Sequence, residues 1–230
     1  EYCKEVENGC KNFKETTDKW RVLTDGESDT IIDKIMSDIA TRVLGRVSRN
    51  KNKIEYLLQR MKKILKRSIE IVRLSLSRGE YSAVCYEEKF EIEVEWKKRK
   101  ITLDGIIDRV DAAEYPAEGK ISLRIIDYKS GKKDFNVVSI SNNTDMQLVV
   151  YSIAATELYK KGSLGRAQKG LSPTVGGILY NKLRDDMVSC TSSDIDKLDE
   201  LLKKDMKLDG VIVSDGDDIK AAKSMDKTLN

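Results

Sequence analysis

The spacing of apolar residues changes along this sequence from a helical period to a period of two, and this change constrains the fold most. Through residues 27–47 and 52–77 apolar side chains recur at intervals of three and four, and the second run stops at Gly79. This spacing predicts two amphipathic helices, the second closed by a glycine cap. Through residues 90–96 apolar and charged residues alternate, which is typical of a half-exposed strand.

Two apolar stretches follow, over residues 101–110 and 121–128, and the polar segment between them contains a proline and a glycine. This pattern predicts a hairpin with a longish loop over residues 111–120. Later spacing predicts three more elements: a helix over 144–161, a strand over 175–183 and a helix over 193–206. We therefore expect one α/β domain, with residues 1–80 as an N-terminal helical part and residues 81–230 as an α/β core.

The composition is that of a globular protein without histidine. Of the 230 residues, 40% are hydrophobic, 42 are Lys or Arg, 39 are Asp or Glu and none is His, which leaves a net charge of +3. The missing histidine excludes Ser-His-Asp and Cys-His nucleophile systems and His-ligated zinc within this sequence. Any catalysis must therefore use carboxylates, lysine, hydroxyl groups or a metal ion held by oxygen ligands.

The four cysteines, Cys3, Cys10, Cys85 and Cys190, show neither the CxxC spacing of a zinc or redox motif nor the density of a disulfide scaffold. Free thiols in a reducing cytoplasm are the expectation. No apolar run reaches the roughly 18 residues of a membrane span, and no signal peptide is recognisable. We therefore expect a cytoplasmic protein without a membrane partner. The sequence begins without Met, which suggests a processed product or a piece of a longer protein.

Positive charge is concentrated in one segment. Between Arg42 and Arg73 there are eleven basic and two acidic residues, a local net charge of +9. Most of this segment coincides with the second predicted helix. Such a helix face could contact phosphates, or it could be an ordinary solvated face.

The ends of the predicted hairpin contain charged residues that are unfavourable in strands. Asp108, Asp127 and Lys129 stand at the ends of apolar stretches, although aspartate and lysine are poor strand formers. If the hairpin turns between residues 117 and 118, paired residues have numbers that add up to 235, and Asp108 lies opposite Asp127. Their Cβ atoms would then be roughly 5 Å apart. Two carboxylates this close repel each other unless a cation lies between them or one is protonated, and oxygen ligands suit Mg²⁺ or Mn²⁺.

Lys129 shares the face of Asp127 because side chains alternate along a strand. A lysine at this position could activate water or stabilise charge on a scissile phosphate. These residues could therefore perform metal-assisted phosphodiester hydrolysis. The alternative is an exposed hairpin in which Asp108, Arg109, Asp127 and Lys129 form ordinary salt bridges.

A longer ordered series of motifs contains these residues. It consists of Glu87-x-x-Phe90, Gly105-x-x-Asp108-Arg109-x-Asp111, Ile126-Asp127-Tyr128-Lys129-Ser130-Gly131 and Gln147-Leu148-x-x-Tyr151. The series closely resembles the RecB-like branch of the PD-(D/E)XK nuclease superfamily, and within it the nuclease domains of AddB-type helicase-nuclease subunits. The resemblance covers roughly residues 20–215, so it extends over a whole domain.

The resemblance implies an α/β, restriction-endonuclease-like core, with a central mixed sheet flanked by helices and an N-terminal helical segment. It implies that Asp108 and Asp127 are catalytic metal ligands for Mg²⁺ or Mn²⁺ and that Lys129 is the catalytic lysine. It also implies Glu87 as a further catalytic acidic residue and metal ligand, and the adjacent Glu88 is the alternative for this role.

Three further residues are implied as substrate-binding candidates. Gln147 and Tyr151 are four residues apart, so they share one helix face, where they would contact substrate or support the site. The alternative is that Tyr151 belongs to the core and Gln147 is its polar neighbour. Arg109 is expected either to pair with an acidic neighbour or to reach a phosphate.

The resemblance implies a metal-dependent DNA exonuclease domain of a helicase-nuclease in double-strand-break repair and recombination. Its partners would be DNA and an AddA-like subunit. The alternatives are a stand-alone RecB-like exonuclease of phage or CRISPR-associated type and a noncatalytic DNA-binding or docking domain. Family members usually have a histidine upstream of the first acidic motif, and many have cysteines that ligate an iron-sulfur cluster. This sequence has no histidine, and its four cysteines do not have the spacing of cluster ligands, so we expect no iron-sulfur cluster in it.

Overall fold

The computed structural model describes residues 1–44, 51–131, 134–142, 146–183, 201–202 and 208–213. Its α-helices are α1 (Tyr2–Val6), α2 (Phe13–Val22), α3 (Asp25–Leu44), α4 (Lys51–Arg78), α5 (Val137–Ser141) and α6 (Gln147–Lys160). Its strands are β1 (Ser82–Trp96), β2 (Arg99–Tyr115), β3 (Lys120–Lys129), β4 (Ser172–Lys182) and β5 (Asp209–Ile212).

The five strands form one mixed sheet in the order β1-β2-β3-β4-β5. Neighbours are antiparallel except β3 and β4, which are parallel. The crossover between these two contains α5 and α6, as a parallel pair requires a long connection. A short 3₁₀ turn over Pro116–Glu118 joins β2 to β3, and Gly119 closes it in the left-handed region with φ of 65°. A mixed sheet flanked by helices, with an N-terminal helical segment, confirms the expected fold.

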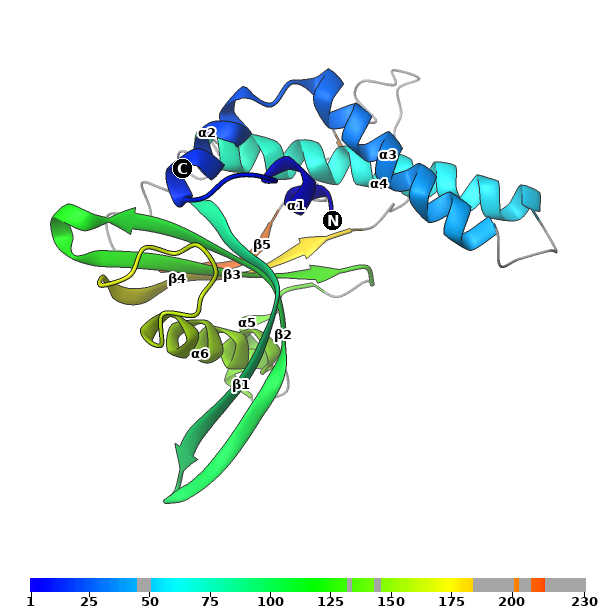
Figure 1. Ribbon diagram of the computed structural model, residues 1–230. Helices are drawn as coiled ribbons and strands as arrows, with labels where there is room; N and C mark the ends of the chain where they lie inside the picture. The colour runs from blue at the N-terminus through cyan, green and yellow to red at the C-terminus, as the bar shows by residue number, and fades with distance from the viewer. Residues whose placement is uncertain (45–50, 132–133, 143–145, 184–200, 203–207, 214–230) are drawn as a thin grey trace.

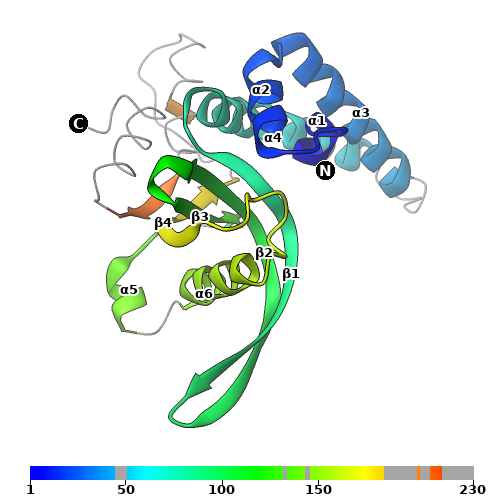
Figure 2. The ribbon, with the colours of Figure 1, turned by 60° about the vertical axis from the view of Figure 1, so that its left-hand side comes forward.

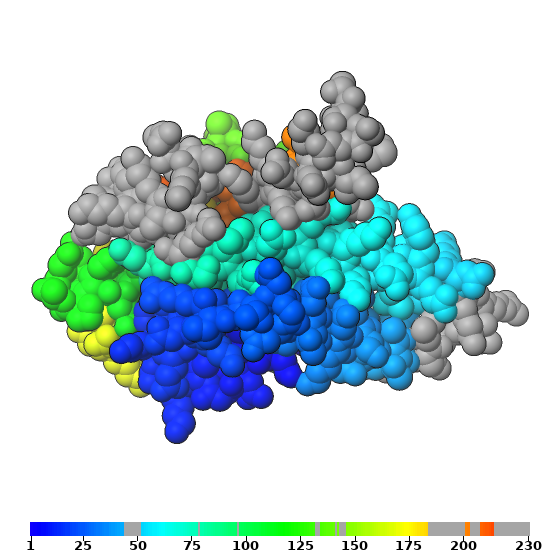
Figure 3. Space-filling model, turned by 90° about the horizontal axis from the view of Figure 1, so that it is seen from above, coloured from blue at the N-terminus to red at the C-terminus, as the bar shows by residue number. Residues whose placement is uncertain are grey.

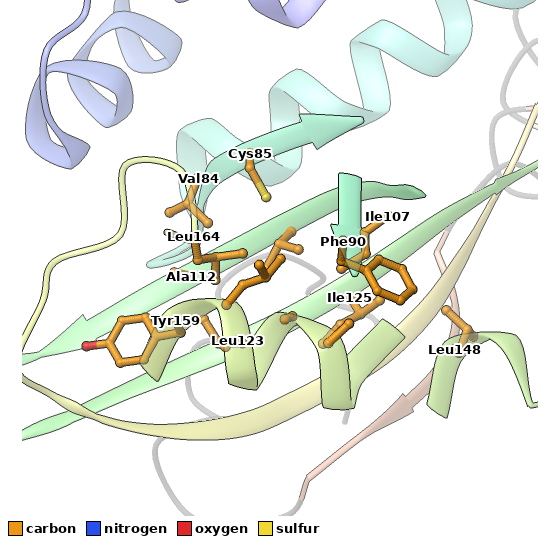
Figure 4. Close-up of a cluster of buried hydrophobic side chains, with 14 of the residues drawn as sticks. Val84, Cys85, Phe90, Ile107, Ala112, Leu123, Ile125, Leu148, Tyr159 and Leu164 are labelled. Atoms are coloured by element: carbon orange, nitrogen blue, oxygen red, sulfur yellow. The ribbon is translucent and has the colours of Figure 1, made fainter. Parts of the chain in front are cut away.

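The sheet lies between two helical layers (Figures 1 and 2). Helices α1 to α4 cover one face, and α6 covers the other. The main hydrophobic core fills the space between the sheet and α6, where side chains of β1, β2 and β3 meet Leu148 and Tyr159 of α6 (Figure 4). A second cluster of Val6, Trp20, Val72 and Leu76 joins α1, α2 and α4. The helical layer thus has a small hydrophobic core of its own.

The basic segment lies mostly on α4, and part of its charge is paired within the helical layer. Helices α3 and α4 pack along each other on the surface shown in Figure 3. Three ion pairs join them: Lys62–Asp33, Lys66–Asp29 and Arg73–Asp25. For these three cations the structure favours a structural role, and DNA binding by the rest of the segment stays a prediction. None of the helices in the described ranges is long and apolar enough to cross a membrane.

The predicted elements agree with the structure except at specific places. The expected helices correspond to α3, α4 and α6, and the expected strand over 175–183 corresponds to β4. The loop expected over 111–120 was wrong, because β2 continues to Tyr115. The predicted helix over 193–206 lies outside the described residues except for helical residues 201–202. Four of the helices and strands in the described ranges were not predicted: α1, α2, α5 and β5.

Candidate active site

The β2–β3 hairpin has the predicted register, and this places the two aspartates next to each other. Pairing extends to Arg109 opposite Ile126, so Asp108 and Asp127 are the next residues on the two strands. A carboxylate oxygen of Asp108 accepts a hydrogen bond from the backbone N–H of Tyr128 at 2.8 Å. This bond turns the Asp108 side chain toward β3. Asp127 is buried. Both aspartates thus lie directly beyond the last paired residues of the β2–β3 ladder.

Lys129 lies beside Asp127 and is held by α6. Its Nζ is 2.5 Å from Oδ2 of Asp127 and donates to Oε1 of Gln147 at 2.7 Å. The Gln147 amide nitrogen in turn donates to the Tyr151 hydroxyl at 2.9 Å. The ammonium group also stands 5.1 Å from the centroid of the Tyr180 ring on β4, a cation–π arrangement. Hydrogen bonds therefore link Gln147 and Tyr151 to the lysine, and Tyr151 also packs against the main core.

Two other motif residues support this chain of contacts from β1 and β2. The ring of Phe90 packs edge-on against Tyr151, with ring centroids 5.9 Å apart. Gly105 is paired with Phe90 across the β1–β2 ladder, and a Cβ atom there would stand 3.0 Å from the Phe90 ring. Glycine lets the ring lie across β2. The Phe90 and Gly105 motifs thus position Tyr151, and through it Gln147 and Lys129.

The structure does not bring the carboxylate of Glu87 to the two aspartates. Glu87 lies between the β1 residues paired with Arg109 and Ile107, so its backbone runs beside Asp108. Its φ is 52°, which is uncommon for a non-glycine residue, and its exposed carboxylate pairs with Lys4 at 2.8 Å. The hydrogen bond and charge of Lys4 lower the pKa of Glu87. The expectation that Glu87 ligates the metal is therefore not met by this arrangement.

Glu88 differs from Glu87 in its surroundings. It is two residues before Phe90, a buried core residue that packs toward α6, and alternate residues of a strand share a face. Its charge contributes to the raised pKa of Cys85, although burial is the main cause. Of the two glutamates, Glu88 is thus the one on the α6 side of the sheet.

Arg109 points away from the candidate site and is completely buried. Its Nε and Nη2 atoms donate to the two carboxylate oxygens of Asp111, each at 2.6 Å. Both side chains are at most 2% exposed. Of the two arrangements expected for Arg109, the structure has the pairing with an acidic neighbour; contact with a substrate phosphate stays a prediction.

A buried glutamate on the same side ties the N-terminal helices to the back of the sheet. Glu7 is 3% exposed and accepts hydrogen bonds from Tyr86 at 2.6 Å, Trp20 at 2.8 Å and Arg166 at 2.6 Å. Burial is the main reason that the pKa of Tyr86 is raised well above its usual value. The sequence reasoning missed this network, because its members are scattered along the chain and belong to no recognisable motif.

Sequence comparison decides the family. A sequence model of the PD-(D/E)XK nuclease superfamily matches residues 13–226. The chain belongs to the PD-(D/E)XK nuclease superfamily. The aspartates and lysine at the end of the β2–β3 hairpin are therefore candidates for the superfamily's acidic residues and lysine, and the fold is the one that its members share.

The chain is also similar to one group of curated proteins, each named as the B subunit of an ATP-dependent helicase/deoxyribonuclease. The relative from Clostridium tetani is 34% identical over 211 residues, and the match covers 87% of this chain and 17% of the relative. The relative from Clostridium acetobutylicum is 30% identical, and the match covers 94% of this chain and 19% of the relative. The relative from Alkaliphilus metalliredigens is 28% identical, and the match covers 92% of this chain and 18% of the relative. The chain thus spans less than a fifth of the length of these relatives.

The donor set at the hairpin end fits a divalent cation. PD-(D/E)XK nucleases generally use divalent metal ions such as Mg²⁺. Asp108 and Asp127 offer carboxylate oxygens, and no group of three or more His, Cys, Asp or Glu side chains suited to a metal occurs among the described residues. Mg²⁺ commonly binds through one or two carboxylates and retains waters that substrate phosphates can replace. Two aspartates are therefore sufficient for such an ion.

A buried lysine stands beside Lys129 in the sheet. Lys182 on β4 is paired with Lys129 in the parallel ladder, and its Nζ contacts Asp134 at 2.6 Å and Asp209 at 2.9 Å. Burial disfavours the Lys182 ammonium, but the hydrogen bonds to the two carboxylates outweigh it and raise the pKa. The sequence signal was available, since Lys182, like Lys129, ends an apolar strand against local preference. This cluster fixes the end of β4 next to the candidate site.

Proposed function

We propose that this chain is a deoxyribonuclease domain that hydrolyses DNA phosphodiesters at Asp108, Asp127 and Lys129. The observation that carries the proposal is the ammonium group of Lys129 placed 2.5 Å from the buried carboxylate of Asp127 and fixed by Gln147. A fixed positive charge placed where negative charge develops in the transition state accelerates the hydrolysis of a phosphodiester. The proposal also rests on membership of the nuclease superfamily.

Each residue has a stated task in this proposal. Asp108 and Asp127 would hold Mg²⁺ or Mn²⁺ through their carboxylate oxygens. When bound, the ion supplies Lewis-acid polarisation of the scissile phosphate. Lys129 stabilises the charge that develops on the phosphate oxygens as water adds and the phosphorus–oxygen bond breaks. Gln147 and Tyr151 keep the lysine in place, since their hydrogen bonds fix its head group.

The context proposed for this activity comes from the relatives. Their name describes one subunit of an ATP-dependent helicase/deoxyribonuclease. We infer that this domain acts on DNA as an exonuclease in such an assembly, with an AddA-like helicase as partner, in cytoplasmic repair and recombination at double-strand breaks.

The test is digestion of linear double-stranded DNA in Mg²⁺ or Mn²⁺ by the parent chain and two variants, Asp127→Asn and Lys129→Ala. We expect each variant to lose at least about 100-fold in rate while its circular dichroism spectrum stays unchanged. Lys120→Ala is the matched control, because Lys120 is an exposed lysine at the other end of β3. It should cut like the parent. Equal activity of Asp127→Asn and parent would overturn the site assignment, and DNA binding without any cutting by the parent would favour a noncatalytic DNA-binding domain.

A further inference from the structure

Strands β1 and β2 extend past the rest of the sheet as a two-stranded arm formed by residues 89–106. Its ladder is unbroken from Lys89 opposite Ile106 to Trp96 opposite Arg99. The arm passes α6 and then projects from the molecule, so that its tip is remote from the other strands and the helical layer (Figures 1 and 2). Near α6 its inner face belongs to the main core. The arm is therefore a continuous extension of the β1–β2 part of the sheet, which also contains Asp108.

The turn at the tip has an unusual sequence for its geometry. A two-residue loop, Lys97-Lys98, joins the strands, and φ is 48° at Lys97 and 62° at Lys98. Two successive positive φ angles are those of a type I′ turn, which favours the pairs Asn-Gly, Asp-Gly and Gly-Gly. Non-glycine residues in this region are strained, and such outliers point toward a functional constraint. At this tip the chain has lysines where stability alone would favour Asn-Gly.

Charge on the arm is sharply divided. Four consecutive exposed cations form the tip: Lys97, Lys98, Arg99 and Lys100. One face of the arm behind the tip is acidic, and its exposed carboxylates come from Glu91, Glu93, Glu95 and Asp104. The Glu93–Lys100 ion pair at 3.1 Å is highly exposed, so it is a weak restraint on Lys100. A polyanion would be repelled by the acidic face and attracted only at the tip.

We propose that this basic tip binds the phosphate backbone of double-stranded DNA at a fixed distance from the cut site. The proposal rests on the proposed function, because Asp108 marks the position of the scissile phosphate. Arg99 and Asp108 are nine positions apart on β2, so at about 3.3 Å per residue the strand between them spans about 30 Å. This distance corresponds to about nine base pairs of duplex DNA. The arm thus selects duplex that continues for about one turn from the reacting end.

The test compares the parent chain with Lys97→Asn/Lys98→Gly, a double variant that removes two charges and installs the sequence preferred by a type I′ turn. Because the variant should fold at least as well as the parent, weaker binding cannot be attributed to unfolding. The probes are fluorescein-labelled DNA hairpins with stems of about 6 and about 24 base pairs, and the measurement is anisotropy in metal-free buffer from low to high salt. On the long stem we expect the slope of log binding constant against log salt concentration to be shallower by about 2 for the variant than for the parent.

The same comparison contains its own controls. On the short stem, which cannot reach from the cut site to the tip, parent and variant should bind alike. Lys14→Gln/Lys19→Gln removes the same charge from exposed positions of α2 and should keep the parent slope on both stems. Equal slopes for parent and tip variant on the long stem would overturn the proposal.

Failure of the proposed function is separable from failure of the arm. Asp127→Asn should abolish cutting yet keep the tip-dependent salt slope. If the parent does not cut DNA but the slope still depends on the tip, the nuclease assignment fails and the arm remains a DNA contact. If cutting depends on Asp127 and the slope does not depend on the tip, only the arm proposal fails.

Discussion

The β2–β3 hairpin contains two pairs of an aspartate and a cation, each two residues apart on one strand, and they lie on opposite faces of the sheet. On the α6 side, Lys129 contacts Asp127 at 2.5 Å and is 18% exposed. On the side of the N-terminal helices, Arg109 contacts Asp111 at 2.6 Å, and neither side chain is more than 2% exposed. The two pairs have similar spacing in the sequence and nearly equal distances.

The difference between the pairs lies in the cation and in its surroundings. The Arg109 guanidinium is planar and makes two parallel bonds to Asp111, an arrangement that fixes both groups. The Lys129 ammonium is a compact charge on a flexible stem, and it has partial access to solvent. One pair is therefore suited to be a fixed, buried part of the sheet, and the other is suited to meet a phosphate.

The largest expected effect breaks the buried pair. Asp111→Ala leaves the Arg109 guanidinium buried without its carboxylate, and loss of one member of such a pair costs about 3–5 kcal/mol. We expect chemical denaturation to show this loss in the free energy of unfolding. Arg109→Met/Asp111→Leu removes both charges and should recover most of the stability. A fully stable Asp111→Ala variant would contradict the structural role of this pair.

The second prediction sharpens the role of the exposed pair. Gln147→Leu removes the acceptor that holds Lys129 and should lower the single-turnover rate of DNA cutting about 10-fold or more, by analogy with other supporting residues around catalytic sites. The DNA dissociation constant and the melting temperature should change little, because Gln147 is at the edge of the core. Gln147→Glu keeps an acceptor and should cut faster than Gln147→Leu. A loss confined to DNA binding would instead assign Gln147 to substrate contact.

The same two pairs show how far the sequence could be interpreted. The apolar alternation and the turn residues predicted the hairpin and its register, because both are local properties of the strands. The end of β2 was mistaken for a loop, since Asp111 is polar and its partner Arg109 becomes meaningful only once both are buried. The sequence shows which residues are charged, but it does not show which face of the sheet their side chains occupy.

The N-terminal helices were missed for a related reason. α1 has only five residues, too few for a helical period to be detected, and α2 has few apolar residues. Their position depends on long-range contacts, such as the hydrogen bond from Trp20 to Glu7 and the packing of Trp20 against α4. The candidate site could be predicted more completely than the fold around it, because its motif residues are clustered on one hairpin and one helix.

The third prediction uses pH to probe the α6 side of the sheet. Burial, and then the charge of Glu88, raises the pKa of Cys85 to about 12, whereas an unfolded thiol ionises near its ordinary value of about 8.5. The unfolded state therefore releases a proton first, so stability is lost as pH rises above about 8.5. Between pH 8 and pH 10 the free energy of unfolding should fall by about 1–2 kcal/mol more for the parent than for Cys85→Ala. Chemical denaturation at each pH measures this difference. Equal losses would mean that Cys85 is not shielded from water.

The smallest expected effect concerns the glutamate that the structure turns away from the site. Glu87→Gln breaks an exposed ion pair with Lys4, and such pairs contribute at most about 1 kcal/mol. The depressed pKa of Glu87 means that this contribution is present above the ordinary carboxyl pKa and is lost as pH falls through the folded value. We expect cutting within about twofold of the parent, with Lys4→Ala behaving alike. A 100-fold loss in Glu87→Gln but not in Lys4→Ala would mean that this carboxylate leaves Lys4 and joins Asp108 when DNA binds, as its backbone position beside Asp108 allows.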